Sequence, residues 1–236
     1  ELKRRQVEVA RIIDLTPHMK RVTVTGPELA GFQTLGASDH IKLAFPPEGD
    51  GEEQRRDYTP RRFDESTLEP DLDLVLHGDG VATRWLKTAT PGSQVHVLGP
   101  RGSHVLSTEF DWYLLAGDET SIPSIARQIE LLGDNANVTA FIEVTDETDD
   151  LAIPNVTWLH RGTAKPGTTT LLQDAIRAFG KPEGRGFVSA SGEATSLVPI
   201  RRYLLREAGF NPDFVDVSGH WKRNVADWDH HEAIGE

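Results

Sequence analysis

The pattern of hydrophobic residues changes once along this chain of 236 residues, and the change limits the possible folds more than any other feature. Up to about residue 108, short segments alternate between apolar and polar residues and are separated by Gly or Pro turns. Such alternation is typical of antiparallel strands with one buried face. Farther on, nearly continuous apolar runs alternate with helical patterns, as in parallel sheets covered on both faces. The sequence therefore predicts two domains of different class.

The first part contains six segments that we interpret as strands. They are residues 6–13, 21–25, 41–45, 56–59, 72–77 and 94–98. One short helical pattern covers residues 81–89, directly after a glycine-rich turn. Short strands with turn signals between them are typical of a small barrel. We therefore expect an N-terminal six-stranded antiparallel β-barrel over residues 1–106.

The second part alternates strands with helices. We expect strands at residues 112–116, 138–144, 156–159, 186–190 and 214–217, and helices at 122–132, 170–179 and 193–208. This order is typical of a doubly wound, Rossmann-like domain with a parallel sheet. We assign it residues 107–236.

Composition excludes several classes of function. The net charge of −12 makes nucleic acid an unfavourable partner. The chain has no cysteine, which excludes disulfides, zinc–thiolate sites and iron–sulfur clusters and fits a reducing compartment. No apolar run reaches the roughly 18 residues of a membrane span, and the first residues lack a signal-type apolar core. We expect a cytoplasmic monomer without a membrane span.

A basic stretch, RRDYTPRRFD at residues 55–64, stands out against this negative charge. In an extended strand Arg56 and Tyr58 share one face, and Thr59 lies on the other. An arginine fork pairs with phosphate, and a tyrosine ring packs against a planar group. These residues suit a nucleotide cofactor with a pyrophosphate and a flat head group. The alternative is an exposed, solvated basic strand.

A second candidate is the glycine-rich turn from His77 to Thr83, between a strand and a helix start. Unpaired N–H groups at a helix start attract anions, and Gly78 and Gly80 let backbone approach a phosphate. The alternative is an ordinary strand-to-helix turn. Together with Arg56, however, the turn puts two phosphate-favouring elements into one barrel.

The loop after the first strand of the second domain carries Gly117, Asp118, Glu119 and Thr120. Ligands of doubly wound sheets bind outside the carboxyl ends of the strands. Because two carboxylates repel a pyrophosphate, we interpret this loop as facing a nicotinamide or ribose. The alternative is a capped helix start with Pro123 in its first turn. Acidic residues 145–150 either bind a ribose diol or form a solvated loop, and residues 189–194 form another turn that can reach a dinucleotide.

Near its end the chain carries Trp221, Lys222 and Arg223. An aromatic ring with two cations suits a flavin and an anionic ligand, and the alternative is a partly buried tail. Beyond it lie residues with metal-ligand chemistry, which we interpret as a chain end rather than a metal site: Asp227, Asp229, His230, His231 and Glu232.

Six segments taken together resemble the FAD-dependent siderophore-interacting proteins, a family of ferric-siderophore reductases distantly related to the ferredoxin reductases. They are RRDYTPRRFD at 55–64, LHGDGVATRWL at 76–86, PGSQVHVLGPRGS at 91–103, GDETSIPSIAR at 117–127, SGEATSLVPIRRYL at 191–204 and SGHWKRN at 218–224. They keep the family's order over nearly the whole chain. The resemblance implies an FAD-binding barrel followed by an NAD(P)H-binding domain.

The resemblance also implies roles for individual residues of the barrel. Arg56 would hold the FAD phosphates, Tyr58 would pack on the isoalloxazine, and Thr59 would reach its N5 edge. His77 and the turn would hold the pyrophosphate side through Gly80, Val81, Ala82 and Thr83. Here V-A-T stands where the family usually has P-A-S, a change that retains the backbone contacts and one hydroxyl.

For the second domain the resemblance implies docking of NADH or NADPH at Asp118, Glu119 and Thr120, with Trp221 near the flavin. The family often ends G-Y-W-R-R-G, whereas this chain has G-H-W-K-R-N. A basic cluster near the flavin would receive the ferric siderophore, and the candidates are Lys42, Arg127, Lys222 and Arg223.

The activity implied is that of an FAD-dependent NAD(P)H:ferric-siderophore oxidoreductase, which reduces Fe(III) and so loosens it from its chelator. The chemistry is centred on the flavin, so the resemblance implies neither a protein metal site nor a catalytic side chain. Two alternatives stay open. One is a flavin-dependent oxidoreductase with another acceptor, and the other is a protein that binds a siderophore without turnover.

Overall fold

A computed structural model describes residues 3–47, 49–226 and 228. The chain divides into two compact units, Glu1–Leu106 and Ser107–Glu236. In the described part, no helix combines the length and the apolar character needed to cross a membrane.

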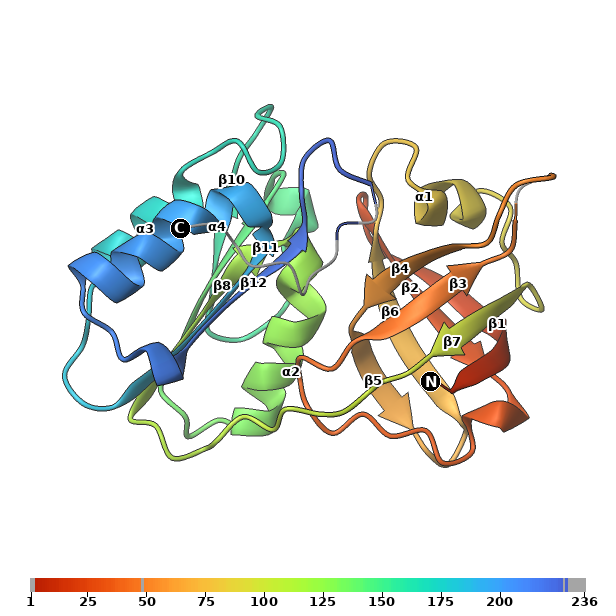
Figure 1. The fold of residues 1–236 in the computed structure, drawn as a ribbon, viewed down its shortest axis with the longest axis horizontal. Coiled ribbons are helices and arrows are strands. Elements are labelled where there is room, and N and C mark those ends of the chain that lie inside the picture. The colour runs from red at the N-terminus through yellow and green to blue at the C-terminus, as the bar shows by residue number, and fades with distance from the viewer. Residues whose placement is uncertain (1–2, 48, 227, 229–236) are drawn as a thin grey trace. The chain divides into compact units, whose positions relative to one another are not determined.

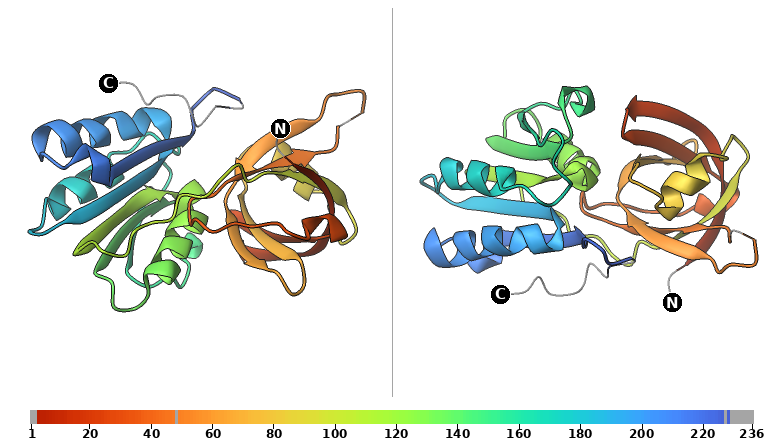
Figure 2. Two further views of the ribbon diagram at one scale, coloured as in Figure 1. Left: turned by 60° about the horizontal axis from the view of Figure 1, so that its bottom comes forward. Right: turned by 90° about the horizontal axis from the view of Figure 1, so that it is seen from above.

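The first unit is a curled antiparallel sheet with one short helix (Figures 1 and 2). Its strands are β1 (Arg4–Thr16), β2 (Met19–Thr25), β3 (Ile41–Phe45), β4 (Gln54–Tyr58), β5 (Pro60–Asp64), β6 (Glu69–Val75) and β7 (Gln94–Leu98). They lie in the order β4-β3-β7-β1-β2-β6-β5. The helix is α1 (Val81–Leu86). The predicted antiparallel barrel is therefore confirmed.

The expected strand count was wrong, because the described residues form seven strands in this sheet and not six. The basic stretch makes two strands, β4 and β5, with Thr59 between them. Pro60 has no backbone N–H to donate and begins β5, a position in which an edge strand tolerates proline. Strands β4 and β5 form the two opposite edges of the sheet. Strand β4 pairs with β3 and β5 pairs with β6.

The barrel core follows from the alternation along the strands. In the first half of β1, exposed and buried residues alternate strictly, and Val7 and Val9 point inward. Phe45, Leu72 and Val97 are almost fully buried in the same cluster, and α1 closes it with Trp85. At about 25 cal/mol per Å² of apolar surface, such burial is the main stabilising contribution.

The second unit is a five-stranded parallel sheet in the order β10-β9-β8-β11-β12. The strands are β8 (Trp112–Asp118), β9 (Val138–Val144), β10 (Val156–His160), β11 (Gly186–Glu193) and β12 (Val215–Trp221). Short 3-10 turns cover Pro27–Leu29 in the first unit and Glu119–Ser121, Glu147–Asp149 and Pro212–Phe214 in the second. The chain builds outward from β8 in both directions, so the switch point lies between β8 and β11. The predicted doubly wound domain is confirmed.

Helices cover both faces of this sheet: α2 (Ile122–Leu132) lies on one face, and α3 (Leu171–Phe179) and α4 (Ala194–Arg202) lie on the other (Figure 1). Every residue of the central strand β8 is buried, as expected from its unbroken apolar sequence. The helix expected over residues 193–208 is shorter, because α4 ends at Arg202 and a π-helical turn, Tyr203–Glu207, follows. Pro199 lies inside α4 and lacks a backbone N–H, which weakens regular α-helical bonding around it.

Candidate functional site

The barrel presents Arg56 and Tyr58 from the edge strand β4, two residues apart and therefore on one face. Tyr58 is half-buried and meets Phe45 edge-to-face, with ring centroids 6.5 Å apart. Burial raises the pKa of Tyr58, and the positive charge of Arg56 opposes that rise. The phenol is thus a neutral, supported ring that can pack against a planar group.

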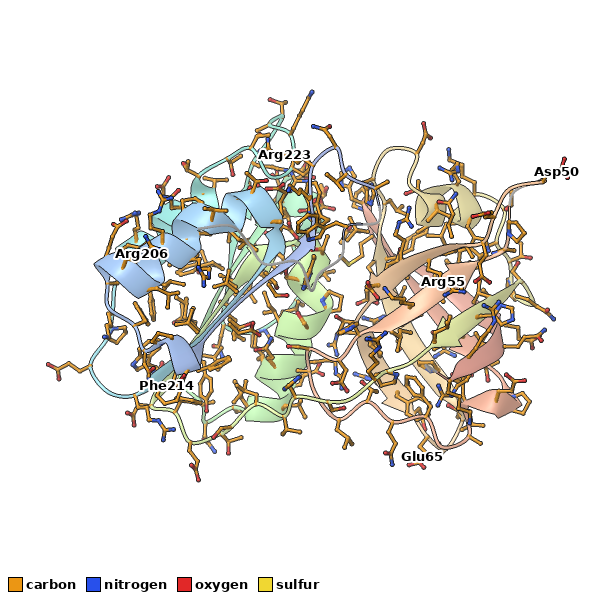
Figure 3. All side chains as sticks on the ribbon, in the orientation of Figure 1. Asp50, Arg55, Glu65, Arg206, Phe214 and Arg223 are labelled. Carbon is orange, nitrogen blue, oxygen red and sulfur yellow. The ribbon has the colours of Figure 1, made fainter. Side chains whose placement is uncertain are left out.

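The neighbouring arginine, Arg55, has a different environment on the same strand (Figure 3). It is exposed and forms an ion pair with Glu53 at 3.0 Å. Hydrogen bonds from Arg4 and then from Arg55 lower the pKa of Glu53 to about 2. Arg56 is half-buried instead, and its guanidinium donates to the carbonyl of Arg55 at 2.6 Å. Because side chains alternate along β4, Arg55 pairs with an acid on one face of the strand, and Arg56 lies on the other face with Tyr58.

The glycine-rich turn ends at Gly80, which is the N-cap of α1 and supplies no side-chain capping bond. The first N–H groups of a helix have no partner within the helix, so this end retains its donors. The hydroxyl of Thr83 accepts from the backbone N–H of His77 at 3.2 Å and closes the turn. A Cβ on Gly80 would lie 2.9 Å from the His77 ring, so the ring packs directly on this glycine.

One cation of this turn was missed by the sequence analysis. Arg84, in the last turn of α1, donates from its guanidinium to the carbonyl of Asp79 inside the loop. Arg84 follows the N-cap Gly80 by four residues, about one helical turn, so the two lie on the same side of the helix. That spacing is the sequence feature from which the contact could have been predicted.

These groups fit the FAD that the resemblance implies. An arginine and an uncapped helix start favour phosphate, Gly80 lets the His77 ring pack on the turn, and Tyr58 offers a supported ring. All of them belong to the first unit.

In the second unit, acidic residues gather at the carboxyl ends of β8, β9 and β11. Asp118 is 5% exposed and accepts from the N–H of Thr120 at 2.9 Å and from the Trp221 indole at 2.8 Å. Burial raises the pKa of Asp118, and hydrogen bonds from Thr120 and Trp221 limit the rise. The structure thus brings Asp118 and Thr120, predicted for this edge, together with Trp221, predicted to lie near the flavin.

Glu119 forms a bidentate ion pair with Arg161, at 2.8 and 2.7 Å. Burial and the nearby Asp118 raise the pKa of Glu119. Glu143, at the end of β9, accepts from Thr169 at 2.5 Å, and burial raises its pKa too. Arg161 and Glu143 were not identified from the sequence, although both lie at or just beyond strand ends.

The four cations predicted to receive a substrate all have protein contacts. Lys42 forms an ion pair with Asp57 on the neighbouring strand, at 2.8 Å. Arg127 lies on α2 and is 9% exposed.

The other two cations lie close to the end of β12. The ammonium of Lys222 lies 4.5 Å from the centre of the Trp228 ring. Arg223 lies 3.6 Å from Glu193. The residues near the chain end with metal-ligand chemistry lie outside the described residues: Asp227, Asp229, His230, His231 and Glu232. Within the described ranges no group of acidic and histidine residues has metal-site geometry.

Comparisons with known proteins agree with both units. The sequence model described as "Siderophore-interacting FAD-binding domain" matches residues 8–55 and 47–104. The model described as "Siderophore-interacting protein" matches residues 110–224. The chain belongs to the siderophore-interacting protein family. The predicted family membership is therefore confirmed.

Two members of known name are similar to this chain. Ferric vibriobactin reductase ViuB of Vibrio cholerae serotype O1 is 31% identical, over 92% of this chain and 89% of its own length. The NADPH-dependent ferric-chelate reductase of Escherichia coli K12 is 29% identical, over 94% of each chain. Among solved structures, a siderophore utilization protein from T. fusca has a TM-score of 0.91 at 40% identity, covering 98% of this chain and 97% of its own.

Proposed function

We propose that this protein is an FAD-dependent ferric-siderophore reductase that takes its electrons from NADH or NADPH. The observation that carries the proposal is the placement of Arg56 and Tyr58 on one face of β4, in a unit that matches a siderophore-interacting FAD-binding domain. The names of the relatives, a ferric vibriobactin reductase and an NADPH-dependent ferric-chelate reductase, support the same reaction.

In this proposal the barrel holds the cofactor. Arg56 and the N–H groups of Val81, Ala82 and Thr83 bind the pyrophosphate, and His77 and Gly80 shape the turn. Tyr58 packs on the flat ring system, and Thr59 binds its edge. When bound, FAD supplies the exchange between a two-electron nicotinamide donor and a one-electron ferric acceptor.

The second unit contributes the docking edge for the nicotinamide donor. Glu119 and Thr120 lie at the switch point of the sheet, where ligands of such folds bind. The substrate is a ferric siderophore, received by cations among which we place Lys42, Arg127, Lys222 and Arg223. Oxygen ligands bind Fe(III) more tightly than Fe(II), so reduction favours release of the iron.

The visible absorption spectrum of the purified protein tests this function. We expect flavin bands, which bleach when NADH or NADPH is added without oxygen and recover when a ferric chelate is added. An Fe(II)-specific dye should then report ferrous iron. Bleaching without ferrous iron would point to another acceptor, and a colourless protein that takes up no FAD would point to a siderophore-binding protein without turnover.

A further inference from the structure

The residues 218–223, here called the tail segment, include the last residues of β12 and the two cations that follow. The segment leaves the sheet beside β11, since Gly192 pairs with Gly219 and Glu193 with Trp221. Two buried carboxylates from other strands hold it there. Their contacts show what fixes the position of these cations.

Asp118, at the end of β8, is saturated by donors from the protein. Its Oδ1 accepts from the N–H and the hydroxyl of Thr120, at 2.9 and 2.5 Å. Its Oδ2 accepts from the Trp221 indole at 2.8 Å and from the N–H of Glu193 at 3.0 Å. A carboxylate has about four lone-pair sites, so these donors leave no acceptor direction for an outside ligand. The role of Asp118 is therefore to hold other residues.

The bond to Trp221 links parts of the chain that are 103 residues apart. The backbone of Trp221 is fixed by pairing with β11, and the far end of its side chain is fixed by Asp118. A ring held at both ends has one orientation, in the way that outer hydrogen bonds orient the ligands of a metal. Thr120 also contacts His220, with its hydroxyl 3.2 Å from Nδ1.

Glu193 holds the segment one step farther on. It is 2% exposed and accepts from the backbone N–H of Arg223 at 3.1 Å. Its other oxygen accepts from the N–H of Ser196 at 2.7 Å, at the start of α4. Lys222 therefore lies between two anchored residues, Trp221 and Arg223.

We propose that Asp118 is a positioning residue for the ferric chelate. By fixing the Trp221 indole, Asp118 sets where the tail segment presents Lys222 and Arg223 to an anionic ligand. This inference rests on the proposed function and goes beyond it, because it makes the protein's affinity for a negatively charged substrate depend on a buried acid that does not touch the substrate. Chelates of different charge should therefore respond differently when Asp118 is changed.

The test compares Asp118→Asn, Trp221→Phe and the double variant. In Asp118→Asn, an amide NH2 in the place of Oδ2 would face two N–H donors and release the indole. Phenylalanine retains an aromatic ring but removes the indole N–H together with the five-membered ring. The control is Asp111→Asn, because Asp111 lies at the other end of β8 and accepts from the N–H of Arg185 at 2.6 Å. Asp111 directly precedes β8 and is exposed, so it is a carboxylate with a backbone contact of its own that lies away from the tail segment.

Gallium(III) chelates serve as probes, because they match the charge of the ferric chelates and are not reduced. We expect the dissociation constant of the trianionic gallium enterobactin, measured by equilibrium dialysis, to rise about tenfold in both single variants. The double variant should equal either single variant, since both break one interaction. Binding of the cationic gallium desferrioxamine B should not weaken. With ferric enterobactin, KM should rise, whereas KM for the cationic ferric desferrioxamine B should not.

Three results would overturn the positioning role. The first is an equal loss of affinity for both chelates, and the second is a loss in the double variant equal to the product of the two single losses. The third is a Trp221→Phe variant with unchanged affinity. So would an Asp111→Asn variant that loses affinity to the same extent. If Asp118→Asn does not fold, Trp221→Phe decides the question alone. A protein that binds gallium enterobactin but reduces no ferric chelate would overturn the proposed function. The binding data of the variants would still decide whether Asp118 positions the tail segment. Absence of any gallium chelate binding would overturn both.

Discussion

At the scale of single residues, two successive arginines on β4 have different partners because side chains alternate along a strand. Arg55 is exposed and engaged with Glu53, whereas Arg56 is half-buried on the face of Tyr58. The proposed site therefore depends on the position of the charge and not on the basic character of the stretch.

Replacing Arg56 should weaken FAD binding. We expect Arg56→Ala to lose a charge-assisted contact to phosphate worth about 2 kcal/mol, which is a rise of roughly thirtyfold in the dissociation constant. Fluorescence titration of the cofactor-free protein with FAD measures it. The matched control is Arg55→Ala, which has the same chemical change on the opposite face of the strand.

The comparison between the two variants is decisive. Equal FAD affinity in Arg56→Ala and in the unchanged protein would exclude Arg56 as a phosphate ligand. A similar loss in both variants would mean that overall positive charge, rather than the face of the strand, attracts the cofactor.

At the scale of elements, the carboxyl edge of the parallel sheet concentrates buried acids. Asp118, Glu143 and Glu193 are each at most 5% exposed and lie at the ends of three different strands. Burial raises the pKa of the first two. For Glu193, burial acts in the same direction, but hydrogen bonds from Arg223 and Ser196 outweigh it and lower the pKa. One edge thus holds carboxyls shifted in opposite directions.

The raised pKa of Glu143 predicts a pH-dependent stability. Between its ordinary value of 4.5 and its raised folded value, the folded state binds more protons than the unfolded state. Stability from this group is therefore lost as the pH rises through that window. Glu143→Gln removes the charge and retains an oxygen that can accept from Thr169. We expect this variant to unfold a few degrees above the unchanged protein at about pH 8, and the difference to vanish toward about pH 4.

Thermal unfolding followed by circular dichroism across this pH range measures the difference. The exposed Glu183 offers a control, since Glu183→Gln makes the same change at the surface of the same unit. A Glu143→Gln variant that is less stable by the same amount at every pH would contradict the raised pKa.

At the scale of the whole molecule, each unit has a hydrophobic core of its own. In the first unit the core joins the barrel strands with α1, and in the second a core joins the sheet with α3 and α4. A ligand stabilises the state that binds it, and the proposed FAD contacts are confined to the first unit.

Calorimetry should therefore show two transitions, of which FAD raises only one. We expect a rise of several degrees in the barrel transition at saturating FAD and little change in the other. Expression of residues 107–236 alone identifies the second transition, and its midpoint should not respond to FAD. A single transition would show that the two cores unfold as one cooperative unit, and equal shifts of two transitions would show that FAD binding is not confined to the first unit.

The sequence by itself determined the fold class and the phosphate-favouring elements of the barrel. Alternation of period two over residues 6–13 and 21–25 and the unbroken apolar run at 112–116 are local patterns, and local patterns reflect which faces are buried. The same holds for Arg56 and Tyr58, whose shared face follows from the geometry of a strand. The sequence indicated one strand where there are two, because the change of sheet edge at Pro60 depends on which strands lie on either side.

Only the tertiary structure decided which polar side chains contact one another at the carboxyl edge of the parallel sheet. Asp118 and Trp221 are 103 residues apart, and Glu119 and Arg161 are 42 apart. No periodicity in the sequence relates residues at such separations, since their contact depends on the strand order of the folded sheet. The structure shows that Asp118, which the sequence placed in a cofactor-facing loop, is buried and accepts hydrogen bonds from Thr120, Glu193 and Trp221. The physical reason is that buried carboxylates require donors, and the fold supplies them from distant strands.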